Sequence, residues 1–333
     1  MKPIDTVSIN APGPVAFVGD AGYIIASDGN RIRRWRATDG KEVRQRMDAG
    51  NVICSIAVSR DGKWIVGGTG DGHVVVWDAE SHKKVSRFKG HDKEVLAVDI
   101  SPDATRIASG STDWDARVWS RSTGEQLLGP LEHVFDVAAV KFSPDGQFIA
   151  TATWRRESVQ VYDSRDGHLL FDSPILVGSN INYSFAWIHD SKQLFVLSED
   201  GKVHCLDVPT GRILSAWTIH GNGNSICIAL ASSGAFIAAS AGSSVSFWDT
   251  ATHEQIGPLI HHPANVWYMA ISANHDLAIS GGGKFILQKL HDILPSSYFD
   301  NVGVFRSQRG PIHHDSPVAT DMQSHPPIGG STS

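Results

Sequence analysis

Three side chains of the types that form a hydrolase triad lie close together in this sequence: His91, Ser109 and Asp113. In a serine hydrolase the histidine accepts the proton of the serine hydroxyl, and the carboxylate orients the imidazole. The serine of such an enzyme stands on a sharp strand-to-helix turn, beside backbone amides that form an oxyanion hole. The spacing around Ser109 shows neither feature. We therefore expect these three residues to be structural, and we expect no catalytic residue and no enzyme.

The residue types that hold metals are sparse. The three cysteines, Cys54, Cys205 and Cys227, form no Cys-x-x-Cys pair, and their odd number argues against a disulfide framework. His313-His314-Asp315 lies in a segment rich in Pro, Gly and Ser, where a fixed metal site is not expected. The sequence predicts no metal and no cofactor.

The elements that would position these side chains recur along the chain. Each unit has a short apolar strand, a turn such as Ser143-Pro144-Asp145-Gly146, a second apolar strand, a polar turn, and a third strand that often ends in Trp-Asp. Register marks six residues before the first turn are spaced by 40, 42, 42, 46, 42 and 41 residues. The marks are Gly13, Ile53, Val95, Val137, Tyr183, Ser225 and Val266. Short strands bounded by Gly, Asp, Asn and Ser, without sustained helical periodicity, indicate an all-β fold.

This repeat resembles that of the WD40 family, whose units of about 40–45 residues each form a four-stranded propeller blade. The resemblance covers about residues 4–295 and implies a seven-bladed β-propeller of four-stranded antiparallel blades. Third strands end in Trp-Asp or in variants of it: Trp77-Asp78, Trp119-Ser120, Tyr162-Asp163, Leu206-Asp207 and Trp248-Asp249.

A propeller has to join its first and last blades, because an unpaired edge strand is exposed to other chains. Residues 4–10 alternate apolar and polar side chains, so we expect the N-terminal strand to close the last blade. Val302–Phe305 is the alternative. Residues 1–300 are therefore predicted to form the propeller, and residues 306–333, rich in Pro, Gly, Ser and His, a flexible tail.

The resemblance also implies a role for the residues described first. A blade of this family can contain a buried hydrogen-bond chain of His, Ser or Thr, Asp and Trp. The third blade has the full set, the structural tetrad His91, Ser109, Asp113 and Trp119. Buried polar groups are tolerated when every member is hydrogen-bonded. His133 lacks the matching Asp in its blade, so the tetrad is expected in the third blade alone.

By the same resemblance, the turns between second and third strands and the connections between blades lie on one face, the top, where partners commonly dock. Large aromatic residues stand out there because tight turns prefer Gly, Asn and Asp. Trp, Tyr and Arg are also enriched in binding hot spots. The predicted partner-binding residues are Trp114, Asp115, Phe135, Trp154, Arg155, Arg156, Tyr183 and Trp267. In the alternative interpretation, Trp114 and Trp154 fold back over their own blades.

A second cluster, Arg31, Arg33, Arg34 and Arg36, lies on the third strand of the first blade. It indicates a small cationic surface for an acidic partner or a phosphate group. The alternative is a solvated strand that packs beside another blade.

The totals and the resemblance together favour a binding protein. The formal net charge of −6 does not support a nucleic-acid-binding face, which requires clustered Lys and Arg. No apolar run approaches the ~20 residues of a membrane span, and the first residues contain no apolar signal segment. We expect an intracellular protein, cytoplasmic or nuclear, that does not bind membranes.

The resemblance implies a non-catalytic protein–protein interaction scaffold of the WD40 type. Its expected partners are other proteins or peptides, bound at the top face by a monomeric ring within a multiprotein complex, and nucleic acid is not expected. Two alternatives remain open. One is a substrate receptor or RNA-associated subunit that reads a peptide or a nucleic-acid end, and the other is a propeller enzyme.

Overall fold

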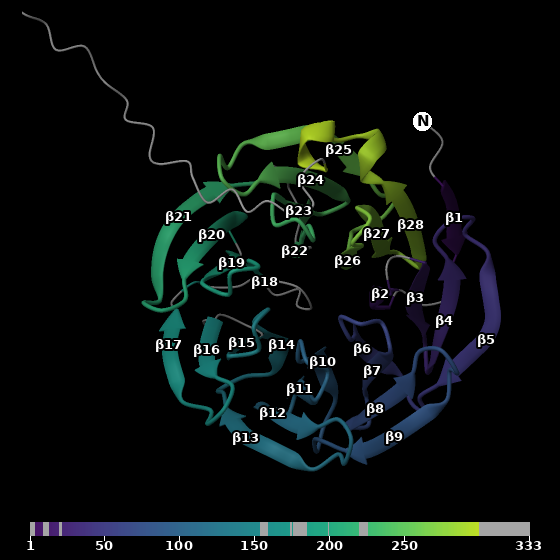
Figure 1. Cartoon of the computed structure of the whole chain (residues 1–333), viewed down its shortest axis with the longest axis vertical. Coiled ribbons are helices and arrows are strands. Elements are labelled where there is room, and N and C mark those ends of the chain that lie inside the picture. The colour runs from purple at the N-terminus through teal and green to yellow at the C-terminus, as the bar shows by residue number, and fades with distance from the viewer. Residues whose placement is uncertain are drawn as a thin grey trace, which may run out of the picture.

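The computed structural model describes residues 4–8, 13–19, 22–153, 159–173, 175, 185–198, 200–219 and 226–299. These residues form seven four-stranded antiparallel sheets that are arranged as blades around a ring (Figure 1). The fold class predicted from the repeat, an all-β seven-bladed propeller, is confirmed. No helix among these residues is long and apolar enough to cross a membrane.

Blades 1 to 4 follow one another along the chain, and in each the four strands pair in sequence order, a to d. Blade 1 contains β2 (Val15–Val18), β3 (Tyr23–Asp28), β4 (Arg31–Arg36) and β5 (Glu42–Asp48). Blade 2 contains β6 (Ile53–Val58), β7 (Trp64–Thr69), β8 (His73–Asp78) and β9 (Lys84–Lys89). Blade 3 contains β10 (Val95–Ile100), β11 (Arg106–Ser111), β12 (Asp115–Ser120) and β13 (Gln126–Glu132). Blade 4 contains β14 (Val137–Phe142), β15 (Phe148–Thr153), β16 (Val159–Asp163) and β17 (Leu169–Ser173).

The remaining blades complete the ring. Blade 5 contains β18 (Phe185–Trp187), β19 (Gln193–Leu197), β20 (Lys202–Asp207) and β21 (Arg212–Thr218). Blade 6 contains β22 (Ile226–Leu230), β23 (Phe236–Ala241), β24 (Ser244–Asp249) and β25 (Gln255–His261). Blade 7 combines β26 (Tyr268–Ile271), β27 (Asp276–Gly281) and β28 (Lys284–Lys289) with β1 (Ile4–Ser8) from the start of the chain.

Blade 7 joins the two ends of the described chain. β1 pairs antiparallel with β28, so that Ile4 lies opposite Leu287 and Val7 lies opposite Phe285. Phe285 also reaches blade 1, where its ring meets the indole of Trp35 edge-on with 5.0 Å between centroids. A strand pair and an apolar contact therefore both join this blade to the beginning of the chain.

The hydrophobic core lies between neighbouring blades, where inner strands such as β7 and β11 are buried on both faces, while outer strands such as β9 and β21 are largely exposed. Between blades 1 and 2, for example, Ile25 and Ile32 pack with Ile65 and Trp77, each at most 1% exposed. Burial on both faces explains why inner strands such as β7 and β23 contain no charged residue.

After β28, the chain covers the outside of blade 6 with two short 3₁₀ helices, η1 (Leu290–Asp292) and η2 (Ser296–Tyr298). Leu290 and Leu294 are buried in the same cluster as Phe236 and Ile256 of blade 6. The Tyr298 hydroxyl donates a hydrogen bond of 2.9 Å to the carboxylate of Asp249. This segment therefore belongs to the folded propeller.

Candidate functional site

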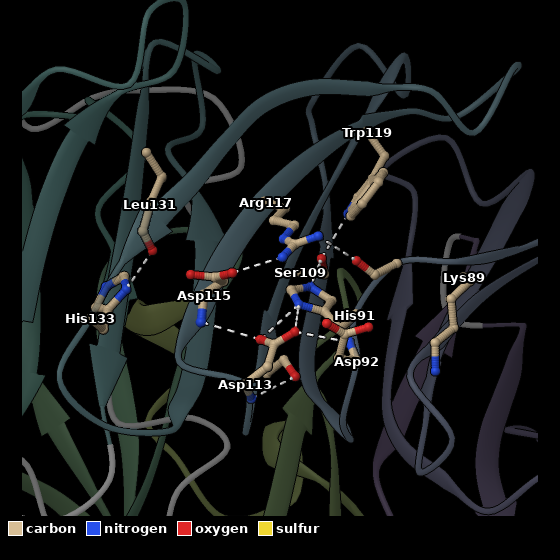
Figure 2. Close-up of polar contacts among 12 residues, drawn as sticks. Lys89, His91, Asp92, Ser109, Asp113, Asp115, Arg117, Trp119, Leu131 and His133 are labelled. Carbon is tan, nitrogen blue, oxygen red and sulfur yellow. Dashed lines mark hydrogen bonds and ion pairs between the residues drawn. The ribbon is translucent and has the colours of Figure 1, made fainter.

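The four tetrad side chains form one continuous hydrogen-bond chain inside blade 3 (Figure 2). The Trp119 indole N–H donates to Ser109 Oγ at 2.8 Å, and 2.7 Å separates Ser109 Oγ from His91 Nε2. His91 Nδ1 lies 3.0 Å from both carboxylate oxygens of Asp113. Because an ionised carboxylate can only accept, Nδ1 carries a proton, and in the neutral imidazole Nε2 accepts the hydrogen of Ser109.

Asp113 ties this chain to the backbone of its surroundings. Its carboxylate accepts the backbone N–H groups of Asp92 at 3.0 Å and of Asp115 at 3.2 Å. Burial by itself raises the pKa of Asp113, but the hydrogen bond and charge of His91 and the amide donors outweigh it and lower this pKa to about 2. The carboxylate is therefore ionised at neutral pH and holds the turn between β11 and β12.

The connectivity from Asp113 through His91 to Ser109 matches that of a serine-hydrolase triad, but its position does not suit catalysis. Ser109 is 0% exposed and His91 is 1% exposed. The Ser109 oxygen also accepts the Trp119 N–H. The arrangement stabilises blade 3. In the described part of the chain, no group of three metal-ligating side chains occurs either.

Trp114 follows Asp113 in the same turn but, unlike the buried tetrad residues, it is half exposed to solvent. It directly precedes strand c of blade 3, the place that Gly72 and Gly201 hold in blades 2 and 5. The φ angles of these two glycines are 82° and 74°, and Trp114 adopts 77°, in the left-handed region that L side chains rarely adopt. The blade geometry therefore favours glycine at this place, and blade 3 has a tryptophan that is 49% exposed.

The Trp114 side chain bridges two blades. Its indole N–H donates to the Asp136 carboxylate at 3.1 Å, in the connection from blade 3 to blade 4. The backbone carbonyl of Trp114 accepts a hydrogen bond of 2.9 Å from the backbone N–H of His133. Lys93 Nζ lies 5.7 Å from the ring centroid, within cation–π range. Trp114 is thus held in place across the blade boundary while half of its surface stays accessible.

The other predicted partner-binding residues have different settings. Phe135 is 37% exposed beside Val134, which is 66% exposed, and the Trp114–Asp136 hydrogen bond links this connection to Trp114. Asp115 pairs with Arg117 at 2.7 Å, and its side chain is 17% exposed. Trp267 is 51% exposed just before β26 of blade 7, which blades 1 and 2 separate from blade 3 around the ring. Trp154, Arg155, Arg156 and Tyr183 lie outside the described residues.

The family model of the WD domain, G-beta repeat, matches residues 42–78, 82–120 and 125–169. These matched stretches lie in a ring of seven four-stranded blades. The chain is a WD40-repeat β-propeller. Two of its matched repeats begin near the outer strand of one blade and end with strand c of the next, so a WD40 repeat is offset by one strand from a blade. No curated protein matches the chain.

Blades 2 and 4 have other residues at some of the positions that form the tetrad in blade 3. In blade 4 the His133 Nε2 lies 2.9 Å from the hydroxyl oxygen of Thr151, but His133 Nδ1 meets the carbonyl of Leu131 at 2.8 Å where blade 3 has Asp113. In blade 2, Gly67 lies at the serine position, and a Cβ there would approach the Trp77 ring to 3.0 Å. The large ring of Trp77 therefore uses the space that a serine side chain would need.

The arginines of β4 are paired within the propeller. Arg33 forms a two-pronged bond with Glu42 at 2.8 and 2.6 Å, and it also contacts Asp28 at 3.3 Å. Arg34 stacks on Tyr23 with 3.6 Å to the ring centroid and donates to the Ala79 carbonyl. The two outer arginines meet Asp48 and Asp39. Each of these guanidinium groups contacts a carboxylate, a carbonyl or an aromatic ring of the propeller. These contacts favour a strand that packs beside a neighbouring blade over a free cationic surface.

Proposed function

We propose that this propeller is a non-catalytic scaffold that binds other proteins through its top face, the end that contains the b–c turns and the connections between blades. WD40 propellers typically bind other proteins, and the present fold is consistent with an interaction scaffold. The observation that carries the proposal is Trp114, which is half exposed in a left-handed turn position where two other blades have glycine.

A left-handed backbone costs a side-chain-bearing residue about 1–2 kcal/mol, and an exposed ring recovers little of that by burial. The Trp114–Asp136 hydrogen bond recovers about as much as this backbone costs, so the exposed ring adds little net stability. A residue that departs from the local preference without a net gain in stability indicates a functional site. Phe135 and Trp267 add exposed aromatic surface on the same face, and aromatic anchors dominate protein interfaces.

We place the ring as a monomer within a larger intracellular complex, with residues 1–300 as the propeller and residues 306–333 as a tail outside it. Light scattering on the purified 36.0 kDa chain would return the monomer mass under this proposal. A dimer mass would contradict it.

Quantitative affinity purification with mass spectrometry tests the top face. Two double variants, Trp114→Gly/Phe135→Ser and Trp154→Ala/Arg155→Ala, should lose the same set of partners that the wild type retains. The matched control is Leu127→Ser/Leu214→Ser, which removes apolar side chains of similar exposure, 54% and 55%, from the outer strands of blades 3 and 5. An unchanged partner set in both top-face variants, with both of them folded, would overturn the proposal.

A further inference from the structure

The surface around Trp114 has a distinct charge. Three segments meet there: residues 92–94, 113–115 and 132–136. The hydrogen bonds Asp92 N–H to Asp113, His133 N–H to the Trp114 carbonyl, and Trp114 Nε1–H to Asp136 connect them. Together they contain six carboxylates and one ammonium group: Asp92, Glu94, Asp113, Asp115, Glu132, Asp136 and Lys93.

Half of these carboxylates already have a partner. Asp113 belongs to the tetrad, Asp115 pairs with Arg117, and Asp136 accepts the Trp114 N–H. Asp92, Glu94 and Glu132 are exposed, and within the described part of the chain no cation pairs with them. Their charge is available to a ligand that approaches from solvent.

Lys93 indicates what the indole accepts. Its Nζ lies 5.7 Å from the Trp114 ring centroid, within the ~6 Å at which a cation is attracted to an aromatic face. The hydrogen bond to Asp136 keeps this ring from rotating away. Val134 and Phe135, 66% and 37% exposed, supply apolar surface beside the same site.

We propose that this acidic aromatic surface, defined as Trp114, Phe135, Asp92, Glu94 and Glu132, binds a basic segment of a partner protein. A Lys or Arg of the partner lies over the Trp114 indole within reach of the exposed carboxylates. An apolar residue next to it packs on Phe135. Charge complementarity selects the partner, since opposite charges steer the encounter and like charges are rejected. The inference rests on the proposed function and specifies which partners the top face takes.

Peptide binding to the full chain tests this directly. The probe is a fluorescent peptide that alternates Arg or Lys with Leu, compared with the same peptide carrying Glu at every basic position. We expect the basic peptide to bind, the acidic one not to bind, and the affinity to fall several-fold as salt rises from about 0.03 M to about 0.3 M.

Variants show whether this surface is responsible. The variants Asp92→Asn/Glu132→Gln and Trp114→Gly should each lower the affinity for the basic peptide by about 10-fold, the equivalent of ~1.4 kcal/mol of binding free energy. The matched control is Glu80→Gln/Glu254→Gln, which removes two exposed carboxylates from c–d turns at the opposite end of the blades. The control should bind as the wild type does, and thermal unfolding should confirm that all variants are folded.

The outcomes separate this inference from the proposed function. Equal binding of the basic peptide to control and surface variants, or no binding at all, overturns the inference. If the top-face variants nevertheless lose partners in affinity purification, the scaffold function stands and its partners are not basic segments. If neither experiment responds to these residues, both proposals fall.

Discussion

The indole of Trp114 donates a hydrogen bond of 3.1 Å to Asp136, across the boundary between blades 3 and 4. The two residues are 22 positions apart, and the bond keeps a half-exposed tryptophan in a fixed place on the top face. A rigid, accessible aromatic ring binds a partner at low entropic cost, because little of its motion has to be lost on association.

Trp114→Gly should separate stability from binding. Glycine adopts the φ of 77° without steric cost, which relieves about 1 kcal/mol, and the loss of an exposed hydrogen bond offsets a similar amount. We expect the free energy of unfolding, measured with urea, to stay within about 1 kcal/mol of the wild type while partner binding falls. A loss above about 3 kcal/mol would mean that Trp114 is a packing residue.

Ser109→Ala should destabilise the fold strongly. It removes the acceptor of the Trp119 N–H and the donor to His91 inside a fully buried site. Leaving two buried groups unpaired costs about 2–4 kcal/mol. The matched control is Ser246→Ala in blade 6. Ser246 accepts the Trp248 N–H at 2.8 Å and donates to the Ala239 carbonyl at 3.3 Å, and among the described residues it has no hydrogen bond to a histidine. Urea unfolding should show the smaller loss in the control, and equal losses would contradict a four-membered network.

Acid should weaken the tetrad in a defined pH window. The pKa of Asp113 is lowered to about 2 in the folded chain, against about 3.9 for an unfolded aspartate. Because the pKa of Asp113 is lower in the folded chain than in the unfolded chain, ionised Asp113 stabilises the fold at every pH above the unfolded-state pKa. This contribution is lost as the pH falls from about 4 to about 2. The contribution amounts to about 2 kcal/mol. Asp113→Asn should therefore show a smaller decrease in unfolding free energy between pH 5 and pH 2 than the wild type, and parallel curves would refute this.

Removal of residues 1–11 should open the ring. It deletes β1 and leaves the outer edge of β28 without its partner. We expect a loss of at least about 3 kcal/mol in unfolding free energy, because several backbone hydrogen bonds and the cover of the blade disappear together. Deletion of residues 306–333 is the control and should leave the thermal midpoint unchanged. Similar midpoints for both truncated chains would contradict ring closure by the N-terminal strand.

Much of the architecture was predictable from local patterns. The register marks Ile53, Val95 and Val137 coincide with the first residues of β6, β10 and β14. This agreement has a simple cause. The alternation of side chains and the choice of turn residues depend on a few neighbouring positions, and the same pattern recurs in seven repeats. The four tetrad positions were predictable in the same way, since the family resemblance specifies them relative to a turn.

Contacts between blades were not predictable in this way. The sequence indicated that Trp114 is unusual for a tight turn, but only the tertiary structure brings Asp136 and Lys93 to it. The arginines of β4 are the converse case. Their spacing indicated a cationic surface, and the fold places Glu42 and Asp28 against Arg33.

The sequence by itself thus determined the number of repeats through their local periodicity, and its resemblance to the WD40 family implied the strand order within a blade and the members of the buried tetrad. The tertiary structure decided which charges are neutralised and which aromatic side chains remain exposed. The physical reason is that these properties depend on segments that meet only when the ring is complete, across a boundary that local pattern does not describe.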